Sequence, residues 1–262
     1  MANFLKKIIR NIYYFGWQRH CVFCGRNARK FVNRKARNIP VIEQQKIVGM
    51  GSRSNCYCPW CGSKDRERLA WFFLSTNTEL CKKENISVLH IAPEKNLKNK
   101  IQSLNVSYIA GDKFTPGYRY PSDTIDLDIT ELSFQDNSFD LVICNHVLEH
   151  VENDLTAMSE IYRVLKSGGG ALLQVPVSYE LSQTKEILGC SAPSDREMEY
   201  GQSDHVRIYG RDYPKRLKEA GFEVQEYTPA VLGFDVKTNA LNPEERIYFA
   251  TKPVSTSIPA HE

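Results

Sequence analysis

The sequence lacks any long apolar run, and this absence limits where the protein can act. Within its 262 residues no segment reaches the roughly 18 apolar residues that a membrane-spanning helix needs. A secretory leader is not expected either, because Arg10 interrupts the apolar stretch at the start and no small-residue cleavage site follows. These absences predict a cytoplasmic protein, in which structural disulfides are rare.

Acidic residues are nearly missing from the first quarter of the chain. Residues 1–70 hold fifteen Lys and Arg but only three acids, the first of which is Glu43. The charge balance is +12 in this part and −9 in the rest, while the whole chain carries only +3. The split predicts a basic N-terminal module that faces nucleic acid, anionic lipid or a charged substrate, the alternative being a solvated basic face.

The first 17 residues are both aromatic and basic, with Lys6, Lys7 and Arg10 set between apolar side chains. This pattern favours an amphipathic helix that rests either on a membrane surface or against the protein's own main domain. Packing against its own protein is the more common outcome, so peripheral membrane contact through residues 1–17 is the alternative.

The basic run between residues 26 and 37 has few aromatic side chains beside its Lys and Arg. Such a run can track phosphates, but reading single-stranded bases also needs aromatic rings for stacking. Nucleic acid is therefore the less favoured partner.

Cysteine is plentiful, and two pairs share one form: Cys21-Val-Phe-Cys24-Gly25 and Cys58-Pro-Trp-Cys61-Gly62. The two-residue gap lets one tight turn aim both sulfurs at a common ion, and the trailing glycine allows a positive φ. Four thiolates suit a closed tetrahedral structural zinc site, so we expect Zn²⁺ to be bound by Cys21, Cys24, Cys58 and Cys61.

Other uses of the cysteines remain open. Cys56 competes with Cys58 as a ligand, although only Cys58 has the repeated spacing. A disulfide pair or free thiols are the alternatives to zinc. The remaining cysteines, Cys81, Cys144 and Cys190, lack partners in sequence and are expected to be small buried apolar residues.

Short apolar strands alternate with amphipathic helices after residue 65. Strands are expected at 86–92, 106–110, 124–127, 139–144, 171–175, 222–227 and 246–251. Helices are expected at 65–74, 95–104, 153–166 and 211–220, the third being stopped by Gly168 to Gly170. The alternation predicts an α/β fold with a doubly wound parallel sheet. The expected domains are residues 1–70, residues 71–252 and a flexible tail at 253–262.

In such a sheet the ligand lies across the carboxyl ends of the central strands. The polar residues that follow each strand are therefore the site candidates. They are His90-Ile-Ala-Pro-Glu94, Gly111-Asp112, Asp128-Ile129 and Asn145-His146.

The run from Asp128 to Val151, followed by Leu165-Lys-Ser-Gly-Gly-Gly170, resembles the second half of a class I S-adenosylmethionine (SAM) methyltransferase of the type 11 kind. Leu132, Phe134, Phe139 and Asp140 look like the family's Leu-Pro-Phe…Phe-Asp pattern, with Ser133 in place of proline. The resemblance covers roughly residues 86–251. It implies a Rossmann-like fold, SAM as the cofactor and methyl transfer as the activity.

The resemblance also implies roles for single residues. Asp112 matches the acid that binds the ribose hydroxyls, and Asp128 matches the acid that receives the adenine amino group, with Ile129 against the ring. Asn145 and His146 would flank the methionine end of the cofactor and the transferred methyl group.

The first loop departs from the family. His90 stands where an acid belongs, and Ala92-Pro93-Glu94 replaces a glycine-rich run. Proline removes a backbone donor, and larger side chains crowd the approach to a cofactor. Either Glu94 takes over the contact with the methionine ammonium, or SAM binding is weakened or lost. The intact second half favours retained binding.

A catalytic base is needed only if the acceptor must lose a proton. The candidates are His146, His150 and His205, with Tyr179 weaker. His205 comes first because residues 203–213 lie where the resembled family commonly places substrate-facing side chains. We expect the acceptor to be a small molecule or a glycan-type metabolite, held partly by the N-terminal module.

Two other functions stay open. His146-Val-Leu-Glu-His150 fits H-x-x-E-H, the motif of inverted zinc peptidases, and a metallohydrolase is the remote alternative. A zinc-containing RNA binder or an RNA methyltransferase is the other. The basic module supports it, and the absence of Asn-Pro-Pro-Tyr after the fourth strand opposes it.

Overall fold

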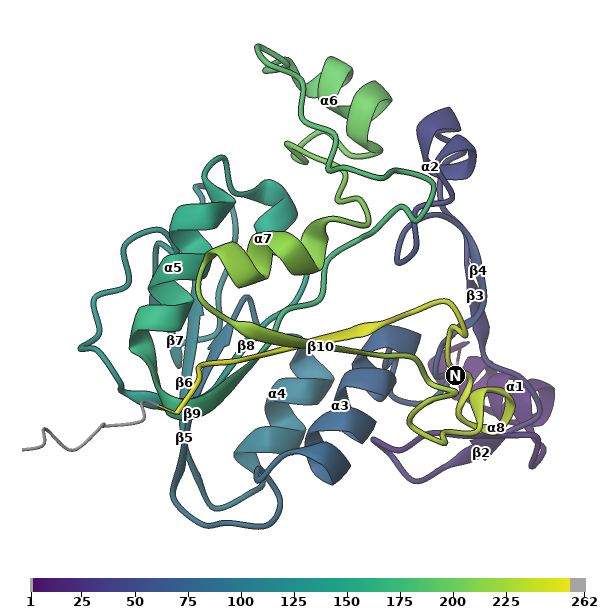
Figure 1. Cartoon of the computed structure of the whole chain (residues 1–262). Helices are drawn as coiled ribbons and strands as arrows, with labels where there is room; N and C mark the ends of the chain where they lie inside the picture. The colour runs from purple at the N-terminus through teal and green to yellow at the C-terminus, as the bar shows by residue number, and fades with distance from the viewer. Residues whose placement is uncertain (1, 255–262) are drawn as a thin grey trace, which may run out of the picture.

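The structure, a computed structural model, describes residues 2–254, with side chains from Phe4 onward. Its centre is a seven-stranded sheet (Figure 1). Across the sheet the strands are β10 (Glu223–Tyr227), β11 (Ile247–Thr251), β9 (Leu165–Leu172), β8 (Phe139–Cys144), β5 (Ile86–Ile91), β6 (Val106–Asp112) and β7 (Thr124–Asp126). The expected tail lies, from residue 255 on, outside the described residues.

The sheet is mostly parallel rather than fully parallel. Strand β11 runs antiparallel to both of its neighbours, β9 and β10, while the other neighbouring pairs are parallel. An antiparallel neighbour needs no helical crossover, so the last strand can return directly beside β10. The sequence predicted the positions of six of these strands; the strand expected at 171–175 overlaps β9 only at residues 171 and 172, and the reversal was not predicted.

Two pairs of helices cover the two faces of the sheet (Figure 1). On one face α3 (Asp65–Asn77) and α4 (Lys95–Gln102) bury Leu69, Phe73 and Leu97. On the other face α5 (Asp154–Val164) and α7 (Tyr213–Glu219) bury Met158 and Leu217. Each helix thus hides its apolar side against the sheet, which is what makes the doubly wound arrangement stable.

The glycine run at residues 168–170 does not stop a helix, so that prediction is wrong. Helix α5 ends at Val164, and β9 begins at the next residue and passes through the glycines. A Cβ on Gly170 would collide with the ring of Phe249, and one on Gly169 would lie 3.1 Å from the carbonyl oxygen of Asp140. The glycines therefore let β9 approach its two neighbouring strands closely.

Small elements precede the sheet and form the N-terminal module. They are α1 (Ala2–Tyr14), β1 (Arg19–His20), β2 (Asn27–Ala28), β3 (Val32–Arg34), α2 (Pro40–Gln44) and β4 (Arg53–Tyr57). Strands β1 and β2 pair with each other, as do β3 and β4. The expected domain border at residue 70 falls inside helix α3.

A buried arginine joins this module to the main domain. Arg68 on α3 is fully buried and donates hydrogen bonds to the carbonyl oxygens of Ser63 (2.6 Å), Cys56 (3.1 Å) and Asn239 (3.0 Å). Asn239 ends the short helix α8 (Val236–Asn239). One guanidinium thereby satisfies carbonyl groups from both parts of the chain.

A second contact lies at the opposite edge of the module. Helix α2 packs beside α6 (Pro193–Tyr200), and Ile42, Met50 and Tyr200 share one apolar cluster (Figure 1). Val48 also forms an antiparallel bridge with Val177. The module therefore touches the main domain on two sides of the sheet's carboxyl edge.

The three cysteines outside the two pairs and Cys56 differ in burial. Cys144 is buried, but Cys190 is half-buried and Cys81 is exposed, so the burial prediction is wrong for Cys81, which lies in a surface turn after α3.

In the described part of the chain, no helix combines the length and apolarity that crossing a bilayer requires.

Candidate functional site

The strand order reverses beside β5. The chain runs from β5 to β6 and β7 on one side, and then to β8 and β9 on the other. Ligands of open α/β sheets bind in the crevice that forms at such a reversal. The loops after β5 and β8 meet there, since Nδ2 of Asn145 lies 3.5 Å from Oε1 of Glu94. The structure thus brings together two of the polar groups that the sequence singled out.

Both strands end in a sharp turn without glycine. Ala92 has a φ of 48° after β5, and His146 has a φ of 56° after β8. This left-handed backbone is what glycine usually provides. A hydrogen bond from the Ala92 N–H to the carbonyl oxygen of Gly111 (2.8 Å) holds the first turn. The altered loop therefore keeps the turn that a glycine would give.

Glu94 is held by a chain of hydrogen bonds behind it. Nε2 of the fully buried His90 lies 3.1 Å from Oε2 of Glu94, and its Nδ1 lies 2.9 Å from the hydroxyl of Tyr108. Burial alone would raise the pKa of Glu94, but the hydrogen bond and charge of His90 bring that pKa below its ordinary value. The result is an ionised carboxylate in the crevice, with His90 positioned behind it.

Buried polar atoms without a partner concentrate around this crevice. In the described part of the chain, ten buried side-chain nitrogen and oxygen atoms lack a hydrogen bond. Eight of these ten belong to what we call the buried polar cluster. Its residues are Arg53, Arg66, Asn145, His146, Glu149 and Glu245. Nη1 of Arg53 does form ion pairs, at 3.1 Å with Asp65 and 3.8 Å with Glu245. The hydrogen-bonding capacity that is left unused in this cluster indicates a place for a polar ligand.

Distances show that the cluster draws on three parts of the chain. Nδ1 of His146 lies 3.4 Å from Oε1 of Glu149, close to the end of β8. A Cβ built on Gly49 would lie 3.4 Å from the His146 ring and 3.8 Å from Glu245. An ion pair of 3.8 Å joins Arg53 to Glu245, which precedes β11. The N-terminal module therefore closes one side of the crevice.

Burial perturbs the titration of the cluster. It raises the pKa of Glu149 to about 7 and, together with the charge of Asp65, that of Glu245 to about 7. Burial and then the charge of Arg66 lower the pKa of His146 well below its ordinary value. His146 is thus a neutral imidazole, and Glu149 can gain or lose a proton near neutral pH.

The other two predicted acids follow β6 and β7 and are more exposed. Burial raises the pKa of the half-buried Asp112, which ends β6. Asp128 accepts hydrogen bonds from the N–H (2.9 Å) and hydroxyl (2.6 Å) of Thr130, and pairs with Lys113 at 2.7 Å. Lys113 first and then Thr130 lower the pKa of Asp128 to about 2. Beside them Ile129 is buried.

The two histidines farther from the crevice lie against each other. The rings of His150 and His205 pack edge to face with their centres 4.7 Å apart. Nδ1 of His150 lies 3.3 Å from Oδ2 of Asp204, and Nε2 of His205 lies 2.5 Å from Nε2 of Gln202. Burial and then the neighbouring His150 lower the pKa of His205 to about 3.

The H-x-x-E-H motif does not form the arrangement that inverted zinc peptidases use. His146 lies in a left-handed turn, and only the three residues Leu148–His150 are helical, as a 3₁₀ turn. Among the described residues, Glu149 and His150 share metal-binding distance with His205 rather than with His146. The two motif histidines therefore do not lie on one helical face, and the metallohydrolase hypothesis loses its geometric basis.

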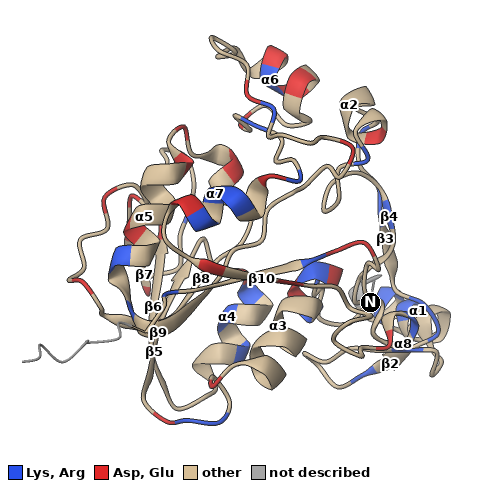
Figure 2. Cartoon of the chain, viewed as in Figure 1, with Lys and Arg blue, Asp and Glu red and all other residues tan. Residues whose placement is uncertain are grey.

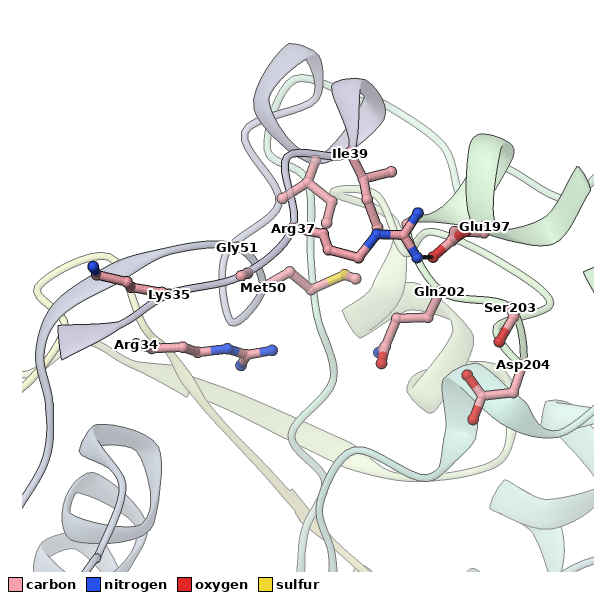
Figure 3. A pocket seen from close by; sticks show the side chains of 13 residues that line it. Arg34, Lys35, Arg37, Ile39, Met50, Gly51, Glu197, Gln202, Ser203 and Asp204 are labelled. Atoms are coloured by element: carbon pink, nitrogen blue, oxygen red, sulfur yellow. Dashed lines mark hydrogen bonds and ion pairs between the residues drawn. The ribbon is translucent and has the colours of Figure 1, made fainter. Parts of the chain in front are cut away.

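A cavity of about 290 Å³ lies between the N-terminal module and the segment that follows α6 (Figure 3). Its charged and polar lining includes Arg34, Lys35 and Arg37 on one side and Glu197, Gln202, Ser203 and Asp204 on the other. Arg37 pairs with Glu197 at 2.9 Å, whereas Arg34 points into the cavity.

This cavity borders the buried polar cluster. Arg34 on β3 is the cross-strand partner of Arg53 on β4, and side chains paired in this way share one face of a sheet. On the opposite wall Asp204 contacts His150, the residue after Glu149. A ligand in the cavity would therefore lie next to the crevice at the end of β8.

The two cysteine pairs form one cluster in the module. Sγ of Cys21 lies 3.5 Å from that of Cys61, Sγ of Cys24 lies 3.8 Å from that of Cys58, and all four lie within 4.8 Å of one another. The N–H of Gly25 donates to the carbonyl of Cys21 (2.8 Å), and Gly62 does the same to Cys58 (3.0 Å). The two turns therefore repeat each other.

The donor set of this cluster fits a zinc ion. Cys56 is directed elsewhere, with its sulfur 3.4 Å from Oδ1 of Asp65. The described cysteines are free thiols rather than disulfides. Four sulfurs at these separations match the tetrahedral preference of Zn²⁺.

Sequence reasoning missed Arg53, Arg66 and Glu245, and it noted Glu149 only as part of a zinc motif. Arg66 follows the second cysteine pair by five positions, and Glu245 lies just before β11. No local pattern marks these residues, because only the tertiary fold carries them to the end of β8. The one available signal was that Arg66 follows closely after the cysteine turn at Cys61, so an ordered turn would hold its side chain in a defined position.

Part of the chain matches a known protein family. Residues 86–173 match the family model described as a methyltransferase domain. An uncharacterised protein of Methanocaldococcus jannaschii is 52% identical over 48 residues, which cover 18% of this chain and 21% of that protein. Demethylmenaquinone methyltransferase of Staphylococcus aureus is 32% identical over 132 residues, which cover 43% of this chain and 55% of that enzyme.

The chain thus spans about a fifth of the length of the first of these curated relatives and little more than half of the second. Among solved structures, a SAM-dependent methyltransferase from Archaeoglobus fulgidus is similar at 15% identity with a TM-score of 0.49, over 71% of this chain and 94% of that chain. Residues 86–173 are therefore similar to a methyltransferase domain, and the family and sequence matches support a SAM-dependent methyltransferase.

Proposed function

We propose that this protein is a SAM-dependent methyltransferase whose N-terminal module completes the cofactor site. The buried polar cluster is the observation that carries the proposal. It places eight polar atoms that lack a hydrogen bond, two of them ion-paired, where the module meets the carboxyl ends of β5 and β8. Asn145, His146 and Glu149 lie within the segment that matches the methyltransferase domain. An amino-acid group that carries both charges, as the methionine part of SAM does, would satisfy such a cluster.

In this proposal Glu94 and Arg66 bind the methionine part. Glu94 is an ionised carboxylate, which suits the ammonium group. Arg66 has a buried Nε without a hydrogen bond to any described residue, and its charge acts on Glu94, His146 and Glu149. It is therefore available for the carboxylate. Ala92 contributes the backbone turn, and Asn145 offers its unpartnered Oδ1.

The adenosine part would lie along the ends of β6 and β7. Asp112 offers its carboxylate to the ribose hydroxyls, for which two acceptor oxygens are well suited. Asp128 and Ile129 would bind the adenine, provided that the exposed Lys113 moves aside from Asp128. These assignments follow the order in which the strands bring the residues to one edge of the sheet.

SAM supplies a methyl group on a positively charged sulfur, so the protein's main task is to align the acceptor and exclude water. Where the acceptor must lose a proton, we assign the base to Glu149, because its pKa of about 7 suits proton transfer at neutral pH. His146, 3.4 Å from it, is neutral and can relay or orient that proton. His150 and His205 would act from behind the wall of the adjoining cavity, where His150 lies 3.3 Å from the lining residue Asp204.

The acceptor in this proposal is a small molecule or a glycan-type metabolite that occupies the cavity in Figure 3. A volume of about 290 Å³ suits a ligand of modest size. Arg34, which points into the cavity, favours an acceptor with a carboxylate or phosphate group, while Gln202 and Ser203 offer hydrogen bonds.

The cysteine cluster would hold a structural Zn²⁺ ion within a module formed by residues 1–70, next to a methyltransferase domain at residues 71–252. Such a closed site contributes folding free energy rather than chemistry. Its second turn, Cys58 to Cys61, is followed directly by the segment that carries Arg66. Zinc would therefore fix the residue that we assign to the methionine carboxylate.

Titration calorimetry with SAM and S-adenosylhomocysteine tests the proposal. We expect one site per zinc-loaded chain and a weakening of at least about tenfold in Glu94→Gln, since a charged hydrogen bond contributes about 1.5–3 kcal/mol. Glu79→Gln is the matched control, because Glu79 is exposed and pairs only with Lys83. Absence of binding by folded, zinc-loaded protein would contradict the proposal.

A further inference from the structure

Helix α1 turns its apolar face away from the protein. Phe4, Leu5, Ile8, Ile9 and Ile12 recur at the spacing that places them on one side of a helix. All five are exposed, from 38% for Ile8 to 72% for Ile12. Side chains of this kind are normally buried, so a continuous exposed face of them marks an interaction surface. The expectation that this helix packs its apolar side on its own domain is wrong.

The opposite side of α1 holds it in this orientation. Tyr14 packs edge to face with Trp60, next to the cysteine cluster, with ring centres 6.2 Å apart. Arg10 lies 6.0 Å from the centre of the same Trp60 ring. Lys30 donates a hydrogen bond to the hydroxyl of Tyr13 at 2.7 Å. The polar and aromatic side is therefore attached to the module, and the apolar side is presented outward.

The charge around this face has one sign. Lys6 and Lys7 border the apolar face on its two sides, and the first acidic residue of the chain is Glu43. Figure 2 shows Lys and Arg, but no acid, along α1. Phe15 and Trp17, both at least 70% exposed, follow the helix directly. Apolar, aromatic and basic side chains in this arrangement are typical of helices that lie in the plane of a membrane surface.

We propose that α1 binds the surface of an anionic lipid bilayer. Phe4, Leu5, Ile8, Ile9 and Ile12 would enter the boundary between headgroups and acyl chains. Lys6 and Lys7 would extend their aliphatic stems along that face and reach the lipid phosphates. The 13-residue helix is far shorter than the roughly 20 residues of a membrane span, so it lies on the bilayer. A second copy of this basic helix is a less suitable occupant, because like charges would meet.

Vesicle co-sedimentation of the zinc-loaded full chain tests this proposal. We expect binding to vesicles of phosphatidylcholine with phosphatidylserine, weak binding to phosphatidylcholine alone, and release as salt is raised. Ile9→Gln/Ile12→Gln should reduce the partition coefficient at least about tenfold, since each loses a buried aliphatic side chain. Lys6→Gln/Lys7→Gln should reduce it about fivefold per charge on anionic vesicles only.

Both variants change exposed helix positions, so they should fold and bind SAM as the unmodified chain does. Failure of the folded protein to bind anionic vesicles would overturn the proposal, as would equal binding to both kinds of vesicle. A concentration-dependent dimer in sedimentation velocity that Ile9→Gln/Ile12→Gln abolishes would assign the face to a second copy instead. Loss of SAM binding alone would leave this proposal intact and contradict only the proposed function.

Discussion

The two ends of the candidate cofactor crevice are built in different ways. At the ends of β5 and β8 the polar groups are largely buried and several lack a hydrogen bond. Two arginines reach this end, Arg53 from β4 of the N-terminal module and Arg66 from the first turn of α3. At the ends of β6 and β7, Asp128 is partly exposed and already hydrogen-bonded to Thr130, two residues further on. The polar groups of the first end are brought together only by the complete fold, and they need a ligand to complete their hydrogen bonds. The second end is formed by residues that are close together in sequence.

The predictions below use this difference. In the proposed function SAM occupies both ends, whereas 5′-methylthioadenosine lacks the amino-acid part and would reach only the second. A change at the methionine end should therefore affect SAM alone. A change at the adenosine end should affect both ligands equally.

Loss of the cysteine cluster should have the largest effect. Cys21→Ser/Cys58→Ser removes two of the four proposed zinc ligands, and structural zinc contributes about 10 kcal/mol or more of binding free energy to small zinc modules. We expect zinc content to fall from one ion per chain to none, and SAM affinity to fall more than about 100-fold. Elemental analysis and calorimetry measure these changes. Cys81→Ser, at an exposed cysteine, is the control. Unchanged SAM binding by the double variant would contradict the proposal that the N-terminal module forms part of the SAM site.

The buried end should also make stability depend on pH. The pKa of Glu149 rises from an ordinary 4.5 to about 7 on folding, as does that of Glu245. Each of these glutamates therefore binds more protons in the folded state than in the unfolded state, and its contribution makes the free energy of unfolding fall as pH rises from about 4.5 to 7. The lowered pKa values of His146 and His205 contribute with the opposite sign, so the glutamate part is read from the difference between the unmodified protein and Glu149→Gln. Each group contributes on the order of 3 kcal/mol to this fall. Urea unfolding of the ligand-free protein at pH 5 and pH 8 measures it. Glu149→Gln should flatten the dependence, and a variant with an unchanged slope would contradict the assignment.

Arg66→Gln separates the two ends directly. The variant should lose about 2 kcal/mol of SAM binding, roughly 30-fold, because a charged hydrogen bond to the methionine carboxylate is removed. Binding of 5′-methylthioadenosine should change by less than about twofold. Lys82→Gln, at an exposed lysine, is the matched control. Equal weakening of both ligands would mean that Arg66 acts through the fold.

Asp112→Asn should affect both ligands alike. The substituted side chain still offers one acceptor oxygen to the ribose hydroxyls, but it no longer carries a charge. Binding should therefore weaken by about 1–1.5 kcal/mol, or roughly tenfold. Calorimetry with SAM and with 5′-methylthioadenosine should give the same ratio to the unmodified protein. If only SAM binding weakens, the proposed placement of the adenosine is wrong.

Lys113→Gln should have the smallest effect. The pair between Lys113 and Asp128 is exposed, and exposed ion pairs contribute about 0–1 kcal/mol. Its loss should change stability by less than about 1 kcal/mol and should strengthen the binding of both ligands slightly by freeing Asp128. A weakening of more than about fivefold would show that Lys113 belongs to the site itself.

The sequence predicted the sheet well because each strand is a short apolar run and its ligand-facing residues follow it immediately. Glu94, Asp112, Asp128 and Asn145 could be named in this way, and the structure places each at a strand end. The reversed direction of β11 could not be read, since strand direction depends on the connection rather than on the strand's own residues.

Residues brought in from elsewhere escaped prediction. Arg53 and Arg66 lie in a segment whose path is set by the cysteine turns and by the buried Arg68, so no local periodicity points to the crevice. Gly170 was interpreted as a helix stop, although its role is to make room for Phe249 of β11. In both cases the missing information is a contact between parts of the chain far apart in sequence.

A crystal structure of the zinc-loaded protein with S-adenosylhomocysteine tests the central claim most directly. We predict that the amino-acid carboxylate lies within hydrogen-bond distance of Arg66, that the ammonium contacts Glu94, and that the ribose hydroxyls contact Asp112. A ligand whose amino-acid part extends into solvent, with Arg66 and Glu94 left without contact to it, would contradict the account.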